Sequence, residues 1–283
     1  MYTLDDLLYL MARLRNPDTG CPWDLKQDFA SIVPHTLEEA YEVADAIERS
    51  DWPHLEEELG DLLFQVIFYG QLGQEQSHFT VASIIDKLVH KLIRRHPHVF
   101  PNRDLSAERS PDDALDEARI AATWNAIKAE EKQLAAETGS KGNNQPSGVL
   151  EDVPVTLPGM SRAVKLQKKA AAVGFDWPDV QAVIDKIEEE LQEVRVELAS
   201  GYQERLEAEI GDLLFAVTNL ARLKKVDPEV AVRGTNQRFK RRFAHVERTM
   251  FKSHGGFEGA TMERMEEAWQ AAKRLEKQGL LPE

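Results

Sequence analysis

The 283-residue sequence has a single cysteine, Cys21, which excludes a disulfide within the chain and is typical of a reducing compartment. Aromatic residues make up only 7% of the chain, and no apolar run approaches the roughly 18 residues that span a bilayer. Basic residues are also scarce, because 35 Lys and Arg face 49 Asp and Glu. The resulting net charge of −14 argues against nucleic acid as the main partner, since a polyanion would be repelled.

Residues 1–6 contain neither a basic stretch nor an apolar core, so we expect no export signal. Together with the lone thiol, this leads us to expect a cytoplasmic protein that does not enter the membrane. Hydrophobic residues account for 42% of the chain, which is enough to form the cores of two domains of ordinary size.

The apolar residues recur with helical periodicity, and no segment alternates convincingly as a strand would. One predicted helix begins near Pro34, with Thr36 as its N-cap and Glu39 at the third position behind it. Another begins at Ser110, with Pro111 at its first position. The remaining predicted helices cover residues 4–14, 54–71, 81–95, 159–173, 180–198, 203–223, 228–251 and 262–278. The expected fold class is therefore all-α, with two tandem and related helical bundles.

A polar stretch separates the two predicted bundles. Residues 139–148 include no apolar side chain and combine Gly, Ser, Asn and Pro, a composition typical of a flexible linker. We therefore predict an N-terminal domain at residues 1–137, a linker at 138–150 and a C-terminal domain at 151–283.

One acidic pattern occurs twice in the chain, with an offset of 151 residues at every position. The first copy consists of Glu38, Glu39, Glu42, Glu58 and Asp61, and the second of Glu189, Glu190, Glu193, Glu209 and Asp212. Each copy divides between two consecutive predicted helices, and within each helix an i,i+3 spacing places two carboxylates on one face. Because the helices are joined by a short break, they should pack as an antiparallel hairpin with their acidic faces together.

Four carboxylates brought this close repel one another, and a divalent cation relieves the repulsion. Oxygen ligands without Cys or His indicate Mg²⁺, with Mn²⁺ as the alternative, rather than Zn²⁺. The candidate metal ligands are Glu39, Glu42, Glu58 and Asp61 in the first half and Glu190, Glu193, Glu209 and Asp212 in the second.

Glu-rich helix faces are often simply solvated, which is the main alternative to a cation site. The second helix of each copy argues against it, because Asp61 and Asp212 both lie in strongly apolar stretches. An acidic side chain among so many leucines requires a partner. The duplication of the whole pattern favours a cation site in each half.

The duplicated acidic pattern resembles the signature of the all-α nucleoside triphosphate pyrophosphohydrolases, and its tandem arrangement is similar to the MazG family. Residues 20–24, 174–177 and 236–242 extend the resemblance, which covers nearly the whole chain apart from the linker. It implies a dimeric, Mg²⁺-dependent enzyme of broad base tolerance, in which water attacks the α-phosphorus of a nucleoside triphosphate and pyrophosphate leaves. It also implies that Glu38 and Glu189 orient or deprotonate this water.

A triphosphate substrate would also need cationic groups. Arg238 and Arg242 are four residues apart and share a helical face, and the resemblance places Trp269 near the substrate. A solvated basic face and a core tryptophan are the alternatives for these residues. The candidate substrate-binding residues are Lys168, Asn236, Arg238, Arg242 and Trp269 in the second half and Lys91 and Arg95 in the first.

Two other functions remain open at this point. The first is a di-metal carboxylate oxidoreductase, against which the lack of Glu-x-x-His pairs argues. The second is a helical module that senses nucleotide or metal without turnover. Both acidic sets are intact, so counting ligands does not decide whether one half or both are catalytic, although the Arg-rich segment favours the C-terminal half. The sequence does not specify the preferred base or sugar.

Overall fold

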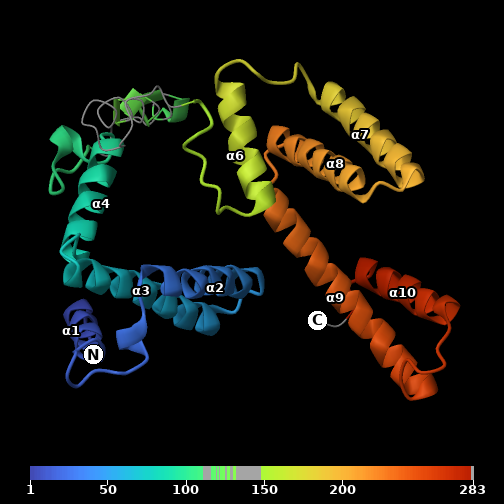
Figure 1. Cartoon of the computed structure of the whole chain (residues 1–283), viewed down its shortest axis with the longest axis horizontal. Coiled ribbons are helices and arrows are strands. Elements are labelled where there is room, and N and C mark those ends of the chain that lie inside the picture. The colour runs from blue at the N-terminus through green and yellow to red at the C-terminus, as the bar shows by residue number, and fades with distance from the viewer. Residues whose placement is uncertain are drawn as a thin grey trace. The chain divides into compact units, whose positions relative to one another are not determined.

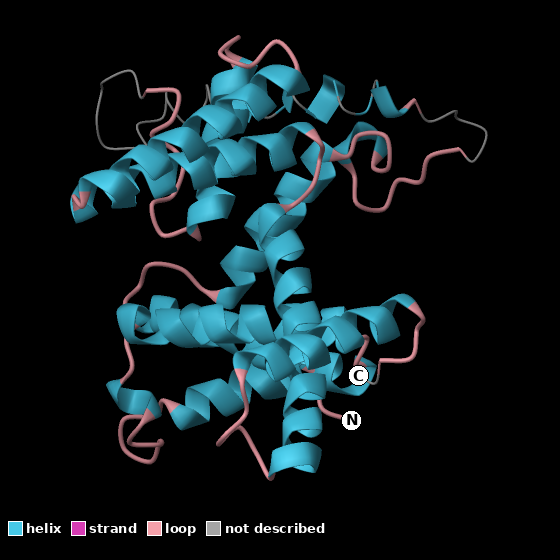
Figure 2. Cartoon of the chain, turned by 90° about the vertical axis from the view of Figure 1, so that its right-hand side faces the viewer, coloured by secondary structure: helices cyan, strands magenta, loops and turns pink. Residues whose placement is uncertain are grey.

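The computed structural model describes residues 1–110 and 148–281 and, between these ranges, residues 116–118, 120, 122–124, 126–127 and 130–131. Every element of regular secondary structure among these residues is a helix, and none is a strand (Figure 2). The all-α fold expected from the sequence is therefore confirmed. Among the described helices, none combines the length and apolar character that crossing a lipid bilayer would demand.

Contacts between Cα atoms divide the chain into unit 1, Met1–Asn143, and unit 2, Asn144–Glu283. The predicted linker at 138–150 lies mostly outside the described residues, as do Pro111 and the start of the helix expected after Ser110. The predicted domain boundaries therefore stay a prediction.

Unit 1 is built around a helical hairpin. Its main helices are α1 (Leu4–Leu14), α2 (Phe29–Glu48), α3 (Trp52–Glu75) and α4 (Val81–Arg95). Helices α2 and α3 lie side by side, and α1 and α4 both pack against α3 (Figure 1). The turn between α2 and α3 is short because Asp51 caps α3, its carboxylate accepting a hydrogen bond from the His54 amide at 3.3 Å.

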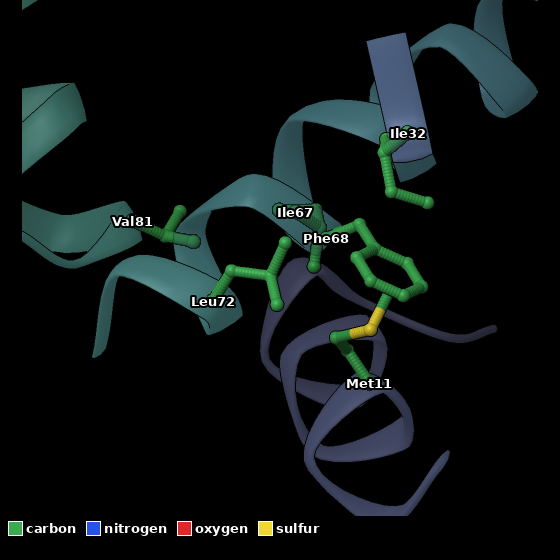
Figure 3. Packing of buried hydrophobic residues seen from close by; sticks show 6 residues of the cluster. All are labelled: Met11, Ile32, Ile67, Phe68, Leu72 and Val81. Carbon is green, nitrogen blue, oxygen red and sulfur yellow. The ribbon is translucent and has the colours of Figure 1, made fainter. Parts of the chain in front are cut away.

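The core of unit 1 lies toward the C-terminal half of α3. Its buried members, drawn in Figure 3, are Met11, Ile32, Ile67, Phe68, Leu72 and Val81. The Met11 side chain points toward the Phe68 ring in that view. Burying each large apolar side chain stabilises the fold by about 1.5–3 kcal/mol. This core fixes one end of α3 and leaves the acidic residues near its other end beside α2.

Unit 2 contains a second hairpin and a long helix. Its helices are α6 (Gly159–Ala172), α7 (Val180–Ser200), α8 (Gln203–Leu223), α9 (Pro228–His254) and α10 (Met262–Lys277). Helices α7 and α8 lie side by side, α6 packs against α8, and α10 lies along α9 (Figure 1). Buried Val246, Met250 and Ala268 hold α9 and α10 together.

Capping residues fix both ends of α7. The Asp179 carboxylate accepts a hydrogen bond from the Ala182 amide at 2.9 Å and so starts the helix. Gly201 ends it with a φ of +75°, a left-handed conformation that glycine adopts at little cost. Because α8 begins at Gln203, the chain reverses within two residues, and the acidic faces of α7 and α8 meet.

The sequence prediction for the start of α2 was wrong, because the helix begins at Phe29 rather than near Pro34. Asp28 and Ser31 form a capping box in which the Asp28 carboxylate accepts from the Ser31 amide at 2.8 Å and the Ser31 hydroxyl accepts from the Asp28 amide at 2.9 Å. Pro34 lies inside the helix, where it supplies no amide donor.

Thr36 is consequently an internal residue of α2 and not its N-cap. Its hydroxyl donates to the Ile32 carbonyl at 3.2 Å, one turn back, and lies 3.0 Å from the Tyr69 hydroxyl on α3. The Thr36–Glu39 spacing matches that of a capping box, but the Thr36 hydroxyl contacts the Ile32 carbonyl and the Tyr69 hydroxyl instead.

Candidate functional site

Three predicted ligands of unit 2 come together on the α7–α8 hairpin. Glu190 and Glu193 from α7 and Glu209 from α8 each offer one carboxylate oxygen, and these oxygens lie within 4.8 Å of one another. Glu190 is only 5% exposed, and its Oε2 has no hydrogen-bond partner within the described residues. An unpartnered buried carboxylate oxygen is costly, so this donor set fits a hard cation.

Lys186 already supplies one positive charge at this cluster. Its Nζ donates to Glu190 Oε1 at 2.7 Å and to Glu189 Oε1 at 2.9 Å. The hydrogen bonds to Glu190 and then Glu189 hold the pKa of Lys186 above its ordinary value. The ammonium therefore stays charged and fixes both glutamates, while Glu190 Oε2 remains available.

Negative charge nevertheless exceeds positive charge around these side chains. The hydrogen bond that a protonated Glu193 can form with Glu190, followed by burial and repulsion from Glu190 and Glu209, raises the pKa of the Glu193 carboxyl. Asp212, the fourth predicted ligand, is exposed and lies outside the group of three. It follows Glu209 by three residues and so shares its helical face, but its role as a ligand stays a prediction.

The corresponding cluster of unit 1 has different members. Glu39, Glu58 and Asp61 each offer an oxygen within 4.8 Å of the others. Glu58 is 6% exposed, and the His54 Nε2 lies 3.1 Å from its Oε1. Glu42 lies outside the group of three but shares a hydrogen bond with Glu58. All four predicted ligands of unit 1 are therefore neighbours.

Burial and mutual repulsion perturb these carboxyl groups as well. Burial first, and then the charges of Asp61, Glu42, Glu58 and Glu38, raise the pKa of Glu39. Burial, and then repulsion from Glu42, raises the pKa of Glu58, although His54 opposes the shift. Raised pKa values of this kind are expected where carboxylates are gathered without their cation.

Sequence reasoning did not assign the two nitrogen-bearing side chains, Lys186 and His54, that contact these clusters. Lys186 precedes Glu190 by four residues, and His54 precedes Glu58 by four. An i,i+4 spacing on a helix is the signal that would have found both. The two units thus differ, since an ammonium group contacts one cluster and an imidazole contacts the other.

Arg242, predicted to bind phosphate, is engaged within the α9–α10 hairpin. Its Nε donates to Glu276 Oε2 at 2.8 Å, and its guanidinium lies 5.7 Å from the centre of the Trp269 ring. Arg241 contacts the same glutamate at 3.2 Å. Trp269 also packs against Phe239, at a ring distance of 5.2 Å. Arg242 and Trp269, both predicted to bind substrate, therefore make these contacts within the α9–α10 hairpin.

Unit 1 repeats this arrangement around Arg95. The Arg95 Nε donates to Glu131 Oε2 at 3.2 Å, and Arg94 shares the same carboxylate. The guanidinium of Arg95 lies 5.4 Å from the centre of the Trp124 ring. Arg95 thus has a packing role of the same kind as Arg242.

Three other predicted substrate-binding residues are exposed. Arg238 donates to the Thr235 hydroxyl at 2.7 Å, one turn earlier on α9. Asn236 and Lys91 are likewise at the surface. Binding of substrate by these three residues stays a prediction.

Lys168 lines a pocket to which none of the clustered carboxylates of its own unit contributes. It lines this pocket together with Arg222, which is thirteen residues after Glu209 on α8. At 1.5 Å per residue, this separation is about 20 Å along the helix. Arg222 is therefore distant from Glu209 along α8, whereas binding of substrate by Lys168 stays a prediction.

An aromatic pocket, which the sequence did not reveal, has a volume of about 540 Å³ and begins one helical turn beyond Asp212. Residues that line it include Gln167, Phe175, Trp177, Phe215, Asn219 and Arg222. The Gln167 Nε2 donates to the Phe215 carbonyl at 2.9 Å, whereas its buried Oε1 has no partner among the described residues. The pocket therefore combines aromatic faces with an unused hydrogen-bond acceptor.

Comparison with known proteins places these hairpins in a family. A model of the MazG nucleotide pyrophosphohydrolase domain matches residues 27–100 and 179–247. The nucleoside triphosphate pyrophosphohydrolase of Escherichia coli (strain K12) is 46% identical over 98% of this chain and 99% of its own length. The nucleoside triphosphate pyrophosphohydrolase/pyrophosphatase MazG of Thermotoga maritima is 38% identical over 95% of both chains.

The two matched ranges contain the two carboxylate clusters, one in each unit. The relationship inferred from the duplicated acidic pattern is thereby confirmed, and the chain belongs to the MazG nucleotide pyrophosphohydrolase family.

Proposed function

We propose that the chain is a Mg²⁺-dependent nucleoside triphosphate pyrophosphohydrolase that releases a nucleoside monophosphate and pyrophosphate. The observation that carries this proposal is the group formed by Glu190, Glu193 and Glu209, in which a buried oxygen has no partner. The printed names of the relatives from Escherichia coli and Thermotoga maritima support the same reaction.

Glu190, Glu193 and Glu209, with Asp212 as the fourth ligand, would hold Mg²⁺ in unit 2. Glu39, Glu42, Glu58 and Asp61 would do so in unit 1. Mn²⁺ is the alternative ion, because it prefers the same oxygen ligands. A bound Mg²⁺ would neutralise phosphate charge and make a coordinated water more acidic.

Residues of the chain would position the attacking water. Glu189 is adjacent to Glu190 and is held by the Lys186 ammonium at 2.9 Å, so its carboxylate can orient the water and accept its proton. The water oxygen forms a bond to the α-phosphorus while the bond from that phosphorus to the bridging oxygen of pyrophosphate breaks. Glu38 would have the same role in unit 1.

The aromatic pocket is the proposed place for the nucleobase in unit 2. Phe215 lies one turn beyond Asp212 on α8, which brings the pocket next to the proposed metal ligands. Stacking on Trp177 tolerates every base, in agreement with broad base tolerance. We assign stacking to Trp177 rather than Trp269, because Trp269 packs against Arg242 and Phe239.

We also propose that the protein is a homodimer in which a second copy covers exposed apolar stripes. Helices α3 and α8 expose apolar residues at i, i+4 and i+7, namely Leu59, Leu63 and Val66 on α3 and Ile210, Leu214 and Val217 on α8. Such repeated stripes are typical of surfaces that bind another helix. Sedimentation equilibrium should show a dimer that Leu214→Glu weakens, and a monomeric wild-type protein at micromolar concentration would contradict this.

Pyrophosphate release from each common ribo- and deoxyribonucleoside triphosphate, with and without Mg²⁺, tests the proposed reaction. The full-length chain should be compared with Glu39→Gln, Glu190→Gln and the double variant. We expect the double variant to lose at least about 100-fold in kcat, because Mg²⁺ contributes several kcal/mol to the transition state. Tight nucleotide binding without any pyrophosphate release would instead favour a sensing module.

A further inference from the structure

A second pocket of unit 2 has four basic side chains in its lining, together with the apolar residues Val164, Val226 and Pro228. It lies between α6 and the turn from α8 to α9, has a volume of about 370 Å³, and shares only Arg222 with the aromatic pocket. We call it the basic pocket, and its polar lining residues are Ser161, Lys165, Lys168, Arg222, Lys225 and Asp227. Its volume is many times the roughly 30 Å³ that one water molecule occupies in the liquid, so it can hold a small solute.

The lysines of the basic pocket have no carboxylate partners. Lys165, Lys168 and Lys225 form no ion pair within the described part of unit 2, although the neighbouring Lys169 pairs with Asp152 and Arg222 pairs with Asp176. This is unexpected in a chain with a net charge of −14. Three ammonium groups around one pocket repel one another, and an anion between them would relieve the repulsion.

Among the described residues that line the basic pocket, Asp227 alone has a carboxylate. This carboxylate forms no ion pair with the residues that the structure describes, and it has another role. Its Oδ1 accepts hydrogen bonds from the amides of Glu229 at 2.9 Å and Val230 at 3.1 Å, and so caps α9. Positive charge therefore exceeds negative charge in the pocket.

The backbone fixes where these lysines lie. Lys165 and Lys168 are three residues apart on α6 and share a helical face. Lys225 has a φ of +57°, a left-handed conformation that is strained for a lysine. The Lys225 amide donates to the Arg222 carbonyl at 3.1 Å, and the Val226 amide donates to the Ala221 carbonyl at 2.9 Å. This tight turn holds Lys225 at the pocket opposite α6.

The basic pocket is a feature of unit 2 and not of the repeated scaffold. Lys165 and Lys168 precede Trp177 by twelve and nine residues, and Met11 and Leu14 precede Trp23 in unit 1 by the same distances. Met11 is fully buried in the core of unit 1. Lysines at these places in unit 2 are therefore not required to build the helix or its packing.

We propose that the basic pocket binds a small phosphate-type anion carrying several charges, of the class of inorganic pyrophosphate, without any metal ion. A multiply charged anion can neutralise several of these ammonium groups, whereas a singly charged one would leave part of the repulsion in place. The site differs from the carboxylate cluster, because none of the clustered carboxylates lines the basic pocket. Binding of this anion does not depend on the hydrolysis proposed above.

Isothermal titration of inorganic pyrophosphate into the full-length chain in excess EDTA tests the proposal. We expect one site per chain, and at least about tenfold weaker binding in Lys165→Gln and in Lys225→Gln, because hydrogen bonds to charged groups contribute this much. Lys224→Gln is the matched control, since it removes the same charge from the same turn at a residue that does not line the pocket. It should bind pyrophosphate as the wild type does.

Inorganic phosphate titrated in parallel distinguishes the ligand, and we expect it to bind more weakly than pyrophosphate. Circular dichroism on each variant shows whether it is folded, and the side chains of Lys165, Lys224 and Lys225 are exposed. Absence of binding in EDTA would overturn the proposal. So would equal weakening by Lys224→Gln and Lys225→Gln, or binding that requires Mg²⁺ and disappears in Glu190→Gln. If the protein proved not to hydrolyse nucleotides, pyrophosphate binding in EDTA would still be expected, so the two proposals can fail separately.

Discussion

At the scale of single residues, the charge around Glu190 determines how the cluster of unit 2 behaves. Lys186 neutralises part of it by contacting Glu190 Oε1 and Glu189, whereas Glu190 Oε2 has no partner among the residues described. The ammonium group stabilises the metal-free protein, but it also adds positive charge where a cation would bind. Lys186 should therefore compete with the metal ion.

Lys186→Met tests this competition. Without metal, the variant should lose roughly 1–3 kcal/mol of unfolding free energy, because a nearly buried carboxylate loses a charged partner. Its affinity for Mn²⁺, measured by electron paramagnetic resonance, should rise about tenfold, equivalent to 1.4 kcal/mol. Lys224→Met serves as the control for the change in net charge. Unchanged or weaker Mn²⁺ binding in Lys186→Met would show that Lys186 does not compete.

The raised carboxyl pKa values predict how stability depends on pH. In the absence of metal, the folded chain retains protons at Glu39, Glu58 and Glu193 that the unfolded chain has already released near the ordinary value of 4.5. These groups therefore lower the stability as the pH rises from about 4.5 through their raised pKa values. Added Mg²⁺ should reverse this loss by binding the ionised form.

Urea unfolding in EDTA between pH 4 and 8 measures the effect as a difference between variants. Ion-paired groups such as Glu276 and Asp176 have lowered pKa values and contribute stability that is lost as the pH falls, so the wild-type curve is a sum of opposing terms. The Glu39→Gln and Glu193→Gln variants should gain stability relative to the wild type as the pH rises. A difference that is constant across the pH range would contradict the repulsion described here.

At the scale of helices, the same clamp occurs in both units, where it joins α10 to α9 in unit 2 and joins Trp124 and Glu131 to α4 in unit 1. Two consecutive arginines form ion pairs with one glutamate. The second arginine lies over the ring of a tryptophan seven residues before that glutamate. The members are Arg94, Arg95, Trp124 and Glu131 in unit 1 and Arg241, Arg242, Trp269 and Glu276 in unit 2. The repetition of this clamp indicates a structural role for arginines that the sequence alone assigned to phosphate.

Arg238 and Arg242 should therefore respond differently to mutation. Arg242→Ala should lower the unfolding free energy by roughly 1–3 kcal/mol, because it removes charged hydrogen bonds to Glu276 and leaves that carboxylate with Arg241 as its remaining partner. Arg238→Ala should leave stability nearly unchanged and raise KM for the nucleotide. Urea unfolding and steady-state pyrophosphate release on both variants check the expectation. The reverse pattern would indicate that Arg242 binds substrate and that Arg238 stabilises the fold.

Helix bounds were predictable where cap and periodicity agree. The predicted ranges 81–95 and 203–223 coincide with α4 and α8, because Thr80 caps α4 and short breaks flank α8. The start of α2 was missed because a proline normally marks a boundary, whereas the Asp28–Ser31 capping box starts this helix five residues before Pro34. Local sequence patterns thus located the helices, but they did not show which of two possible caps starts α2.

At the scale of the whole molecule, the sequence repeat predicted two related helical units and two carboxylate clusters but not the differences between them. Helical periodicity determines which residues share a face, whereas the rotation of one helix against its neighbour depends on packing. Asp61 consequently joins the group of three in unit 1, and its counterpart Asp212 lies outside it in unit 2. The aromatic pocket also escaped prediction, because it is assembled from α6, α8 and the loop before α7.

The central claim is that each carboxylate cluster holds a divalent cation, and anomalous diffraction from crystals soaked in Mn²⁺ tests it most directly. We predict an anomalous peak within coordination distance of Glu190, Glu193 and Glu209, and another beside Glu39, Glu58 and Asp61. Both peaks should disappear in crystals of the Glu39→Gln/Glu190→Gln double variant. Well-ordered carboxylates without anomalous density at a saturating Mn²⁺ concentration would contradict the account.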